Sequence, residues 1–384
     1  RNGNNASLRA ELGALYLAQN RENHALNELR KSVECDPGNK EARLRLASLY
    51  EKHGRFDYAI GELKEALRYH PEDVILHRRL GELYLQGKDL DRALTHFEDV
   101  VKLDPTCADM HNKLGKIYLT KDYNQKSIAQ YRQAVELKKL NPEFREDLAM
   151  ALYCSGELSS AVVELQKAAR IANNDPNLGN YLKAIGIMLL QLNNPEQAED
   201  YLKASVEQQP QDAQARGLLG QLFARQGLTN MAVGEFRKAL EIQPNLHIIH
   251  LYLAKALATA GKHGEAIESF RQLAKNLSQG DEVRLASEAQ VGLAQSYLAN
   301  GQYAEAEEIF RLALKRDPHS LEALHGLAKV ALHKRHFQKG REFLDLALQV
   351  APKDHDLYLT LAQFQGEQGQ WSEAVTTLQR LSVD

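Results

Sequence analysis

Cysteine is scarce in this sequence of 384 residues, which holds only Cys35, Cys107 and Cys154. An odd number of widely spaced cysteines argues against a disulfide framework. It favours a reducing compartment. We therefore expect a cytoplasmic setting, while periplasmic and membrane-associated settings remain open.

Long apolar runs are also missing, so the sequence predicts no direct insertion into a membrane. The net charge is −3 and the isoelectric point is near 6.6. Neither value favours a nucleic-acid partner. The chain begins at Arg1 without Met, and its last repeat unit is incomplete. We expect it to be a piece of a longer protein, so the lack of a signal peptide carries little weight.

The common catalytic motifs are absent as well: the sequence has no HExxH, no GxGxxG after a strand, no GxSxG and no CxxC. His247 and His250 share a helical face, as do His333 and His336. No cysteine or carboxylate cluster completes either pair, so no metal site is predicted. The sequence therefore predicts no cofactor, no metal and no catalysis of its own.

The sequence does contain a pattern that returns about every 34 residues, in segments that begin at residues 6, 40, 74, 108, 142, 179, 213, 247, 287, 321 and 355. Position 7 of the segments is always large and aliphatic. Position 8 is always Gly or Ala. Position 20 is Ala in nine segments, Ser127 in the fourth and Gly340 in the tenth. Such regularity indicates a repeat array, whose function lies on its surface.

Each segment reads as two amphipathic helices, because its apolar residues recur at i, i+3, i+4 and i+7. Glycines that suit a left-handed turn separate the two runs in seven segments: Gly54, Gly87, Gly156, Gly227, Gly261, Gly301 and Gly369. Prolines follow the second run: Pro37, Pro71, Pro105, Pro210, Pro244, Pro318 and Pro352. Small residues at positions 8 and 20 allow close helix approach, and a large residue at position 24 fills the space between pairs.

The repeat changes phase twice, near residues 173–176 and 281–286, which divides the array into blocks 6–175, 179–280 and 287–384. We interpret both slips as tolerated insertions, in a longer helix or in a loop. Residues 1–5 are expected to be disordered.

These residues resemble the tetratricopeptide repeat family over residues 6–384, in about eleven repeats. The third repeat carries the family pattern at Leu80, Gly81, Tyr84, Ala93, Phe97 and Pro105. The resemblance implies an all-α fold, a right-handed superhelical α-solenoid of antiparallel helix pairs with a concave inner surface. The family's early Trp is replaced here by residues such as Arg43, His77 and His111. Gly340 and Arg335 depart from the pattern, so the tenth repeat is expected to be looser.

The resemblance also implies that positions 2, 5, 6, 9, 12 and 13 of each first helix face the groove. These positions give a basic stripe near the start of the chain: Arg45, Arg78, Arg79, Lys113 and Lys116. They give an apolar stretch further on: Leu218, Leu251, Tyr252 and Val291. The stripe could equally be an ordinary solvated face, and the apolar stretch could equally belong to the core.

Two specialised members of the family do not match. The Lys and Asn pair of a chaperone-tail clamp is missing, and so is an asparagine ladder at position 6. We therefore predict a scaffold or adaptor that binds an acidic or amphipathic protein segment along the groove. The substrate-recognition arm of a larger enzyme is an alternative. A self-assembling structural protein, with homo-oligomers formed through the terminal repeats, is another.

Overall fold

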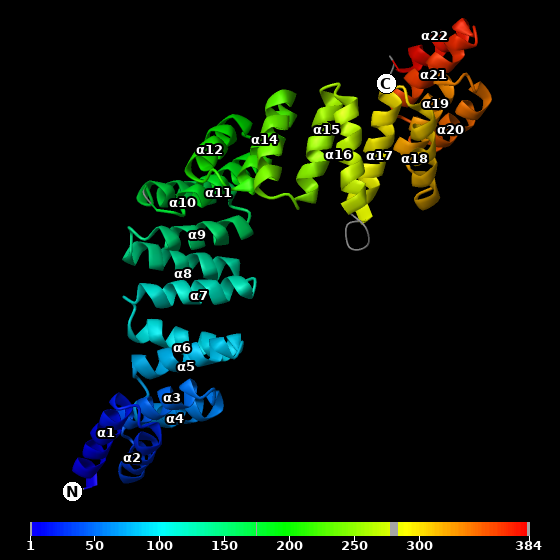
Figure 1. Cartoon of the computed structure of the whole chain (residues 1–384). Coiled ribbons are helices and arrows are strands. Elements are labelled where there is room, and N and C mark those ends of the chain that lie inside the picture. Colours follow the sequence, from blue (N-terminus) through cyan, green and yellow to red (C-terminus); the bar gives the residue numbers. More distant parts are fainter. Residues whose placement is uncertain (1, 174, 277–282, 382–384) are drawn as a thin grey trace. The chain divides into compact units, whose positions relative to one another are not determined.

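The computed structural model describes residues 2–173, 175–276 and 283–381. These residues form 22 α-helices and no strand (Figure 1). Contacts group the chain into two compact units, Arg1–Met188 and Leu189–Asp384. We call them unit 1 and unit 2. The predicted all-α solenoid of antiparallel helix pairs is confirmed.

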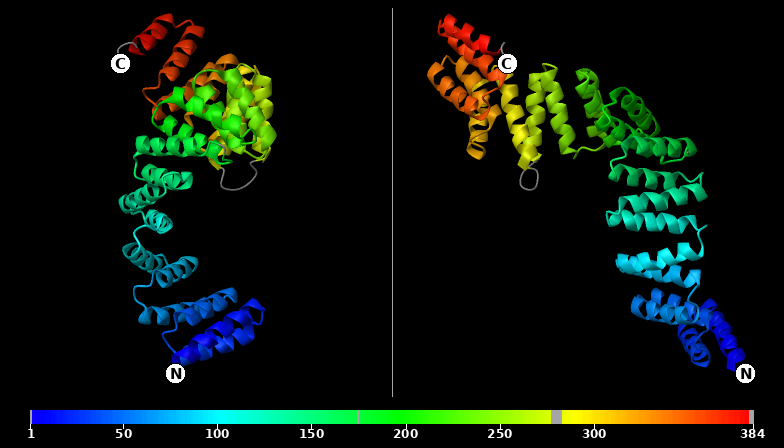
Figure 2. Two further views of the ribbon diagram at one scale, coloured as in Figure 1. Left: turned by 90° about the vertical axis from the view of Figure 1, so that its left-hand side faces the viewer. Right: turned by 180° about the vertical axis from the view of Figure 1, so that it is seen from behind.

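Eleven helix pairs follow one another along the chain. Unit 1 contains α1 (Asn2–Ala18), α2 (Glu22–Cys35), α3 (Lys40–Lys52), α4 (Phe56–Tyr69), α5 (Val74–Gln86), α6 (Leu90–Leu103), α7 (Ala108–Thr120), α8 (Asn124–Leu137), α9 (Pro142–Cys154) and α10 (Leu158–Ile171). The boundary between the units falls within α11 (Leu178–Gln191). Within unit 1, successive pairs stack on one another in each view of Figure 2.

Unit 2 continues the same pattern. It contains α12 (Pro195–Gln208), α13 (Ala213–Arg225), α14 (Thr229–Ile242), α15 (His247–Thr259), α16 (His263–Asn276), α17 (Val283–Ala299), α18 (Tyr303–Arg316), α19 (Leu321–His333), α20 (Phe337–Val350), α21 (His355–Glu367) and α22 (Trp371–Leu381). The odd-numbered helices are the first helices of the repeats, and the even-numbered ones are the second helices.

The core follows the register predicted from the sequence. Position 20 is fully buried from Ala25 to Ala306, and position 24 is nearly so from Leu29 to Leu344. Burying one such large apolar side chain contributes about 1.5–3 kcal/mol. Leu378 occupies position 24 of the last repeat and is 42% exposed. Position 24 is therefore buried wherever a following repeat packs against it.

Glycines make room for the aromatic rings at position 24. A Cβ atom on Gly81 would lie 2.5 Å from Phe97 of the same repeat. Phe310 uses a glycine of the next repeat instead, because a Cβ on Gly326 would lie 2.2 Å from its ring. The space beside Gly340 is likewise occupied by the ring of Phe364 from the next repeat. The expectation of a looser tenth repeat stays a prediction.

Each of the eleven described first helices is followed by a residue in the left-handed conformation. Six glycines adopt positive φ at this turn, among them Gly54 with φ 69°. Gly87 does not: its φ is −74°, and Lys88 takes the left-handed conformation with φ 60°. Arg335 does the same in the tenth repeat, with φ 60°. The turn therefore tolerates residues other than glycine, at a local conformational cost.

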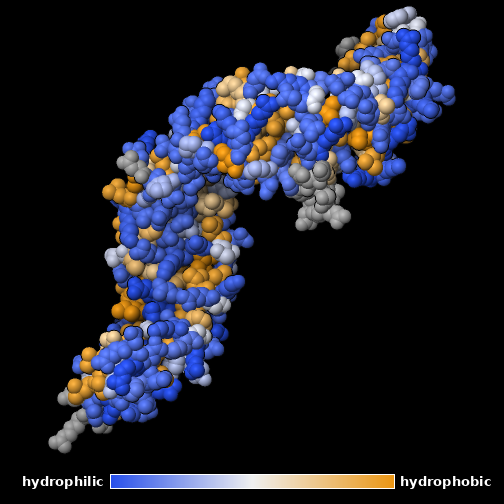
Figure 3. Space-filling view, in the orientation of Figure 1, coloured by the Kyte–Doolittle hydropathy of each residue, from blue (hydrophilic) through white to orange (hydrophobic). Residues whose placement is uncertain are grey.

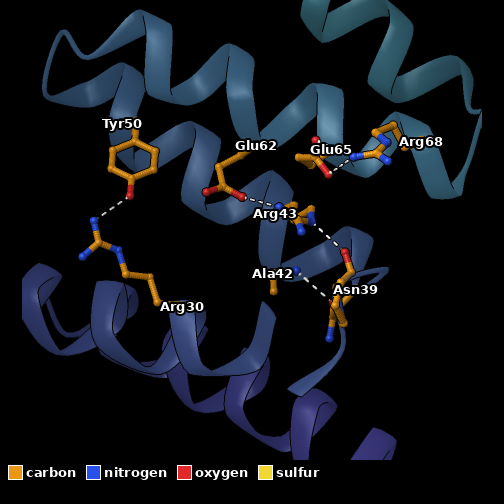
Figure 4. Close-up of polar contacts among 9 residues, drawn as sticks. Arg30, Asn39, Ala42, Arg43, Tyr50, Glu62, Glu65 and Arg68 are labelled. Atoms are coloured by element: carbon orange, nitrogen blue, oxygen red, sulfur yellow. Dashed lines mark hydrogen bonds and ion pairs between the residues drawn. The ribbon is translucent and has the colours of Figure 1, made fainter. Parts of the chain in front are cut away.

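In seven repeats, position 4 of the segment ties the first helix to the loop before it. Arg43 donates from Nε to the carbonyl of Pro37 at 2.8 Å and pairs with Glu62 of α4 at 2.7 Å (Figure 4). His111 contacts the carbonyl of Pro105 at 3.0 Å in the same way. We call this contact the position-4 anchor. It explains why Arg or His can replace the family's Trp, because each offers an N–H donor.

Two sequence expectations differ from the structure at the edges of the array. Residues 1–5 were expected to be disordered, yet α1 begins at Asn2; Arg1 lies outside the described residues. Helix termini need no special residue, because their free N–H groups can bond to water. The first phase slip is a longer loop between α10 and α11. The second is partly absorbed by α17, whose first turn includes Val283 to Ala286. The division into three blocks stays a prediction.

Candidate functional site: the inner faces of the first helices

Successive first helices of unit 1 are joined by polar contacts on one face. Lys113 of α7 reaches Glu82 of α5 at 2.6 Å. Arg79 of α5 reaches Glu51 of α3 at 3.0 Å. Arg45 of α3 donates to the carbonyl of Ala10 in α1 at 2.8 Å. These side chains therefore lie where neighbouring first helices meet.

The basic stripe is largely neutralised by these neighbours. Arg45 also pairs with Glu41 at 2.8 Å, so Arg45, Arg79 and Lys113 each have an acidic partner. Arg78 and Lys116 are exposed and have no ion-pair partner within the described part of the chain. The free positive charge of this face thus resides in two of the five predicted residues.

Carboxylates follow the stripe on α9. Asn112 of α7 donates to Asp147 at 2.7 Å. Burial raises the pKa of Glu146, and the nearby charges of Asp147 and Glu143 raise it further. Burial, together with Glu146 and other carboxylates, raises the pKa of Tyr181 on α11 to about 12. The inner face of unit 1 therefore changes from mixed charge to negative along the stack.

The predicted apolar groove in unit 2 needs correction. Leu251 is 1% exposed and belongs to the core. Leu218 and Tyr252 are half-buried, and Tyr252 stacks on Phe236 with ring centroids 6.0 Å apart. A Cβ on Gly217 would lie 2.5 Å from Ile249, so a side chain of α15 occupies the space beside α13. Much of this stretch is therefore packing between repeats.

Val291 has a different environment, because it lines a cavity of about 830 Å³ bordered by α15, α16, α17 and α19. Val291, Gly292 and Phe270 provide apolar wall, while Gln295, Thr259 and other polar residues surround them. The cavity lies entirely within unit 2. We call it the α15–α17–α19 cavity.

Charges of both signs border this cavity. Lys255 of α15 pairs with Glu288 of α17 at 2.9 Å, and Arg284 contacts the same carboxylate at 3.3 Å. The hydrogen bond from Lys255 is the main cause that lowers the pKa of Glu288. His263 also lines the cavity, and its Nδ1 atom is buried with no hydrogen-bond partner among the described residues. The wall therefore offers charged groups of both signs.

The histidine pairs noted in the sequence do not come together as ligand sets. His250 contacts the carbonyl of Pro244 at 2.9 Å, as a position-4 anchor. His333 stacks on Tyr303 with centroids 4.9 Å apart. Another group was missed: His77, His96 and Asp99 place one nitrogen or oxygen atom each within 4.8 Å of one another. The sequence did hold a signal for this group, because His77 and His96 stand at positions 4 and 23 of one repeat, 19 residues apart, and residues at these two positions meet in other repeats.

The visible surface is mainly hydrophilic, with small hydrophobic patches (Figure 3). One patch lies over α1, where Leu8 and Leu15 are more than 60% exposed. Among the described residues, no helix combines the length and the apolar character needed to cross a bilayer.

Family comparison identifies the repeat. The tetratricopeptide repeat family matches residues 44–108, 184–247, 258–329, 297–354, 108–139 and 356–382. The chain belongs to the tetratricopeptide repeat family. These matches cover most of the chain, in agreement with the eleven helix pairs.

Curated relatives are similar over part of their length. The TPR repeat-containing protein YpiA of Bacillus subtilis is 22% identical over 240 residues, which are 62% of this chain and 55% of YpiA. The human protein O-mannosyl-transferase TMTC1 is 27% identical over 150 residues, 39% of this chain and 16% of TMTC1. The chain thus spans about half of one relative and about a sixth of the other.

Solved structures share the fold. The C-terminal part of a TPR protein from Cytophaga hutchinsonii has a TM-score of 0.57 and 20% identity, covering 65% of this chain and 98% of that one. A chain in the structure of Naa15/Naa10 bound to HypK-THB has a TM-score of 0.50 and 16% identity, covering 97% and 68%. Membership and fold support a protein-interaction scaffold in general. The absence of catalysis stays a prediction.

Proposed function

We propose that this TPR protein is a scaffold that holds an extended segment of a partner protein on the inner faces of its first helices. The α15–α17–α19 cavity is the main binding site in this proposal. Its volume of about 830 Å³ is the observation that carries it. Pockets of about 300–1,000 Å³ are large enough to enclose several side chains of a ligand.

The chemistry of the wall indicates the kind of segment. Val291 and Phe270 suit one apolar side chain, while exposed Gln295 can exchange hydrogen bonds with an extended backbone. Lys255 and Glu288 present opposite charges side by side. An amphipathic segment fits these features better than a purely acidic one.

In unit 1 we propose a weaker, charge-steered contact through Arg78 and Lys116. Both side chains are exposed, and charges of this kind raise association rates more than affinity. The chain that resembles this one in the Naa15/Naa10 structure was solved with HypK-THB bound. This precedent supports a scaffold of similar fold without identifying the partner of this chain.

The similarity to TMTC1 favours a second candidate function. TMTC1 is named as a protein O-mannosyl-transferase, and this chain matches 16% of its length. Under this candidate, the chain is the substrate-recognition arm of a larger enzyme. The same inner faces would then hold the acceptor protein, so the binding experiment below applies to both candidates.

The test selects peptides from a random displayed library on the wild-type chain and measures their affinity for two variants. Gln295→Trp fills the α15–α17–α19 cavity from an exposed position of α17. Gln349→Trp is the matched control on α20, a second helix, and is also exposed. We expect Gln295→Trp to weaken binding about tenfold or more, because interface energy concentrates in a few central residues.

Unchanged unfolding midpoints of both variants would show that the fold is intact. Equal binding of the selected peptides to the wild type and to both variants would contradict the cavity as the binding site. A failure to select any peptide would contradict peptide binding altogether.

A further inference from the structure

A group of three metal-ligating side chains lies between the two helices of the third repeat. His77 comes from α5, and His96 and Asp99 lie one turn apart on α6. The Nδ1 atoms of His77 and His96 are 3.1 Å apart, and Asp99 Oδ2 lies 3.6 Å from His77 Nδ1. His77 is buried, while the other two are half-buried and open toward solvent.

The position-4 anchor fixes the proton of His77. Its Nε2 lies 2.9 Å from the carbonyl oxygen of Pro71. A carbonyl can only accept a hydrogen bond, so Nε2 carries the proton of the neutral ring and Nδ1 keeps its lone pair. Histidine ligands of metals commonly donate their other ring N–H to a backbone carbonyl in this way. The anchor thus presents His77 Nδ1 toward His96 as a ready ligand atom.

Two of the three separations between ligand atoms are close to those of a tetrahedral zinc site. Zinc binds nitrogen and oxygen at about 2.0–2.2 Å, which places neighbouring tetrahedral ligands about 3.3 Å apart. The two measured separations from His77 Nδ1, 3.1 Å and 3.6 Å, lie on either side of this value. All three ligand atoms lie within 4.8 Å of one another. The fourth position would be open to water.

Outer contacts hold the other ligands in place. Lys102 pairs with Asp99 Oδ1 at 3.1 Å, which leaves Oδ2 directed toward His77. The His96 ring stacks on Tyr84 with centroids 5.7 Å apart and an angle of 3° between planes. Such contacts orient the side chains that bind the metal directly and reduce the rearrangement needed for metal binding.

The neighbouring repeats show what this group replaces. In the fourth repeat the equivalent of His96 is Gln130, whose side-chain amide lies 2.7 Å from His111 Nδ1. In the second repeat the equivalent pair is Arg43 with Glu62. Each of these pairs is complete without a third partner. In the third repeat, the imidazoles of His77 and His96 contact each other, and the carboxylate of Asp99 lies beside them.

We propose that His77, His96 and Asp99 form a zinc site that joins α5 to α6. Without metal, His96 donates a hydrogen bond to His77 Nδ1. With Zn²⁺, the proton of His96 moves to its Nε2 atom, and the lone pairs of both Nδ1 atoms and one oxygen of Asp99 bind the ion. The site lies in unit 1 and is independent of the α15–α17–α19 cavity, so it extends the proposed scaffold function without resting on it.

The test titrates the metal-free full chain with Zn²⁺ by calorimetry and with Co²⁺ as a visible-light probe of coordination. His96→Gln is the informative variant, because it recreates the His–Gln pair of the fourth repeat and should fold. Asp99→Asn removes the carboxylate charge. We expect one Zn²⁺ per wild-type chain, and a loss of affinity of about tenfold or more in each variant.

The matched control is His111→Gln, which removes the equivalent histidine from the next repeat and should leave zinc affinity unchanged. Zinc should also raise the unfolding midpoint of the wild type more than that of His96→Gln, because binding stabilises the folded state. Zinc affinity that is equal in the wild type, His96→Gln and Asp99→Asn would overturn the site. So would a wild-type chain that binds no zinc, since the imidazoles would then form a hydrogen bond only.

Discussion

Tyr252 of α15 stacks on Phe236 of α14, with ring centroids 6.0 Å apart and an angle of 27° between the ring planes. Phe236 is fully buried at position 24 of its repeat, while Tyr252 is half-buried on the next first helix. The tyrosine thus covers a core ring at the boundary of two repeats. This placement makes it a packing residue first.

Replacing Tyr252 with Ala should therefore lower the free energy of unfolding by about 2 kcal/mol, less than a fully buried aromatic would cost. Denaturant unfolding measures this loss. The matched control is Ile248→Ala on the same helix, whose side chain is 43% exposed and should change stability little. Selected peptides should bind Tyr252→Ala as they bind the wild type. If Tyr252→Ala kept the stability of the wild type but lost peptide binding, Tyr252 would be a groove residue that contacts the partner.

The contact between Gly81 and Phe97 predicts a coupled pair. Gly81→Ala should destabilise by about 1–3 kcal/mol, because its Cβ would lie 2.5 Å from the Phe97 ring. Phe97→Leu in the same chain should recover part of this loss, since the second repeat has Ala47 and Leu63 at the same two positions and both are buried in the core. A double-mutant cycle by denaturant unfolding measures the coupling.

The control for this pair is a Gly→Ala change that should raise the free energy of unfolding instead of lowering it. Gly61 lies in α4, and a Cβ there would meet no atom within 4 Å. Gly61→Ala should therefore stabilise the chain by about 0.5–1 kcal/mol. Additive effects of Gly81→Ala and Phe97→Leu would show that the two side chains do not share one space.

The two free cations of unit 1 predict a salt-dependent contact. Arg78→Glu with Lys116→Glu should weaken binding of an acidic peptide probe, and added salt should weaken wild-type binding in the same direction. Fluorescence polarisation at two salt concentrations measures both effects. Because both residues are exposed, stability should change by no more than about 0.5 kcal/mol.

Arg79→Glu is the contrasting variant on the same helix. It removes the partner of Glu51, whose pKa is already raised by burial, and adds a third carboxylate near Glu82. Arg79→Glu should lower stability more at neutral than at acid pH, because the carboxylates are charged at neutral pH.

If Arg78→Glu with Lys116→Glu left peptide affinity and its salt dependence unchanged, the charge-steered contact would be excluded.

Tyr181 predicts a loss of stability in alkali. Its pKa is raised from 10.0 to about 12, chiefly by burial and then by the charge of Glu146. A raised pKa means that the folded state holds the phenol proton more tightly than the unfolded state. The protonated phenol of Tyr181 therefore makes its full contribution to the free energy of unfolding below pH 10, and this contribution is lost as the pH rises through about 12.

Urea unfolding over this range of pH measures the effect. Tyr181→Phe cannot ionise, so its unfolding free energy should fall less steeply with rising pH than that of the wild type. Parallel curves for the two chains would show that the phenol ionises equally in the folded and unfolded states.

The sequence was enough to predict the helix pairs and their core. Positions 7, 8, 20 and 24 keep the same character in every repeat. Stacking of antiparallel helices buries them, except at the ends of the array, where Leu12 and Leu378 are exposed. The position-4 anchor was not foreseen, because it depends on a backbone carbonyl rather than on a residue type. Arg43, His77 and Tyr358 share little except a donor that reaches the same place.

The candidate site was harder to predict. The partners of Arg79 and Lys113 lie 28 and 31 residues earlier in the chain, so the charge of the stripe could not be judged locally. Leu251 was misplaced because Gly217 lets Ile249 approach α13, which turns an expected groove into packing. Val291 was predicted, yet the cavity beside it arises from four helices together, α15, α16, α17 and α19.

The position-4 anchors join residues 6 and 19 positions apart in the chain, as Arg43 does with Pro37 and Glu62. The contacts between first helices span about one repeat, such as the 31 residues between Lys113 and Glu82. Folding therefore needs only short loops to close, and short loops have a small entropic cost. One 34-residue unit could then be removed or duplicated, and the remaining units would form the same contacts at the new junction.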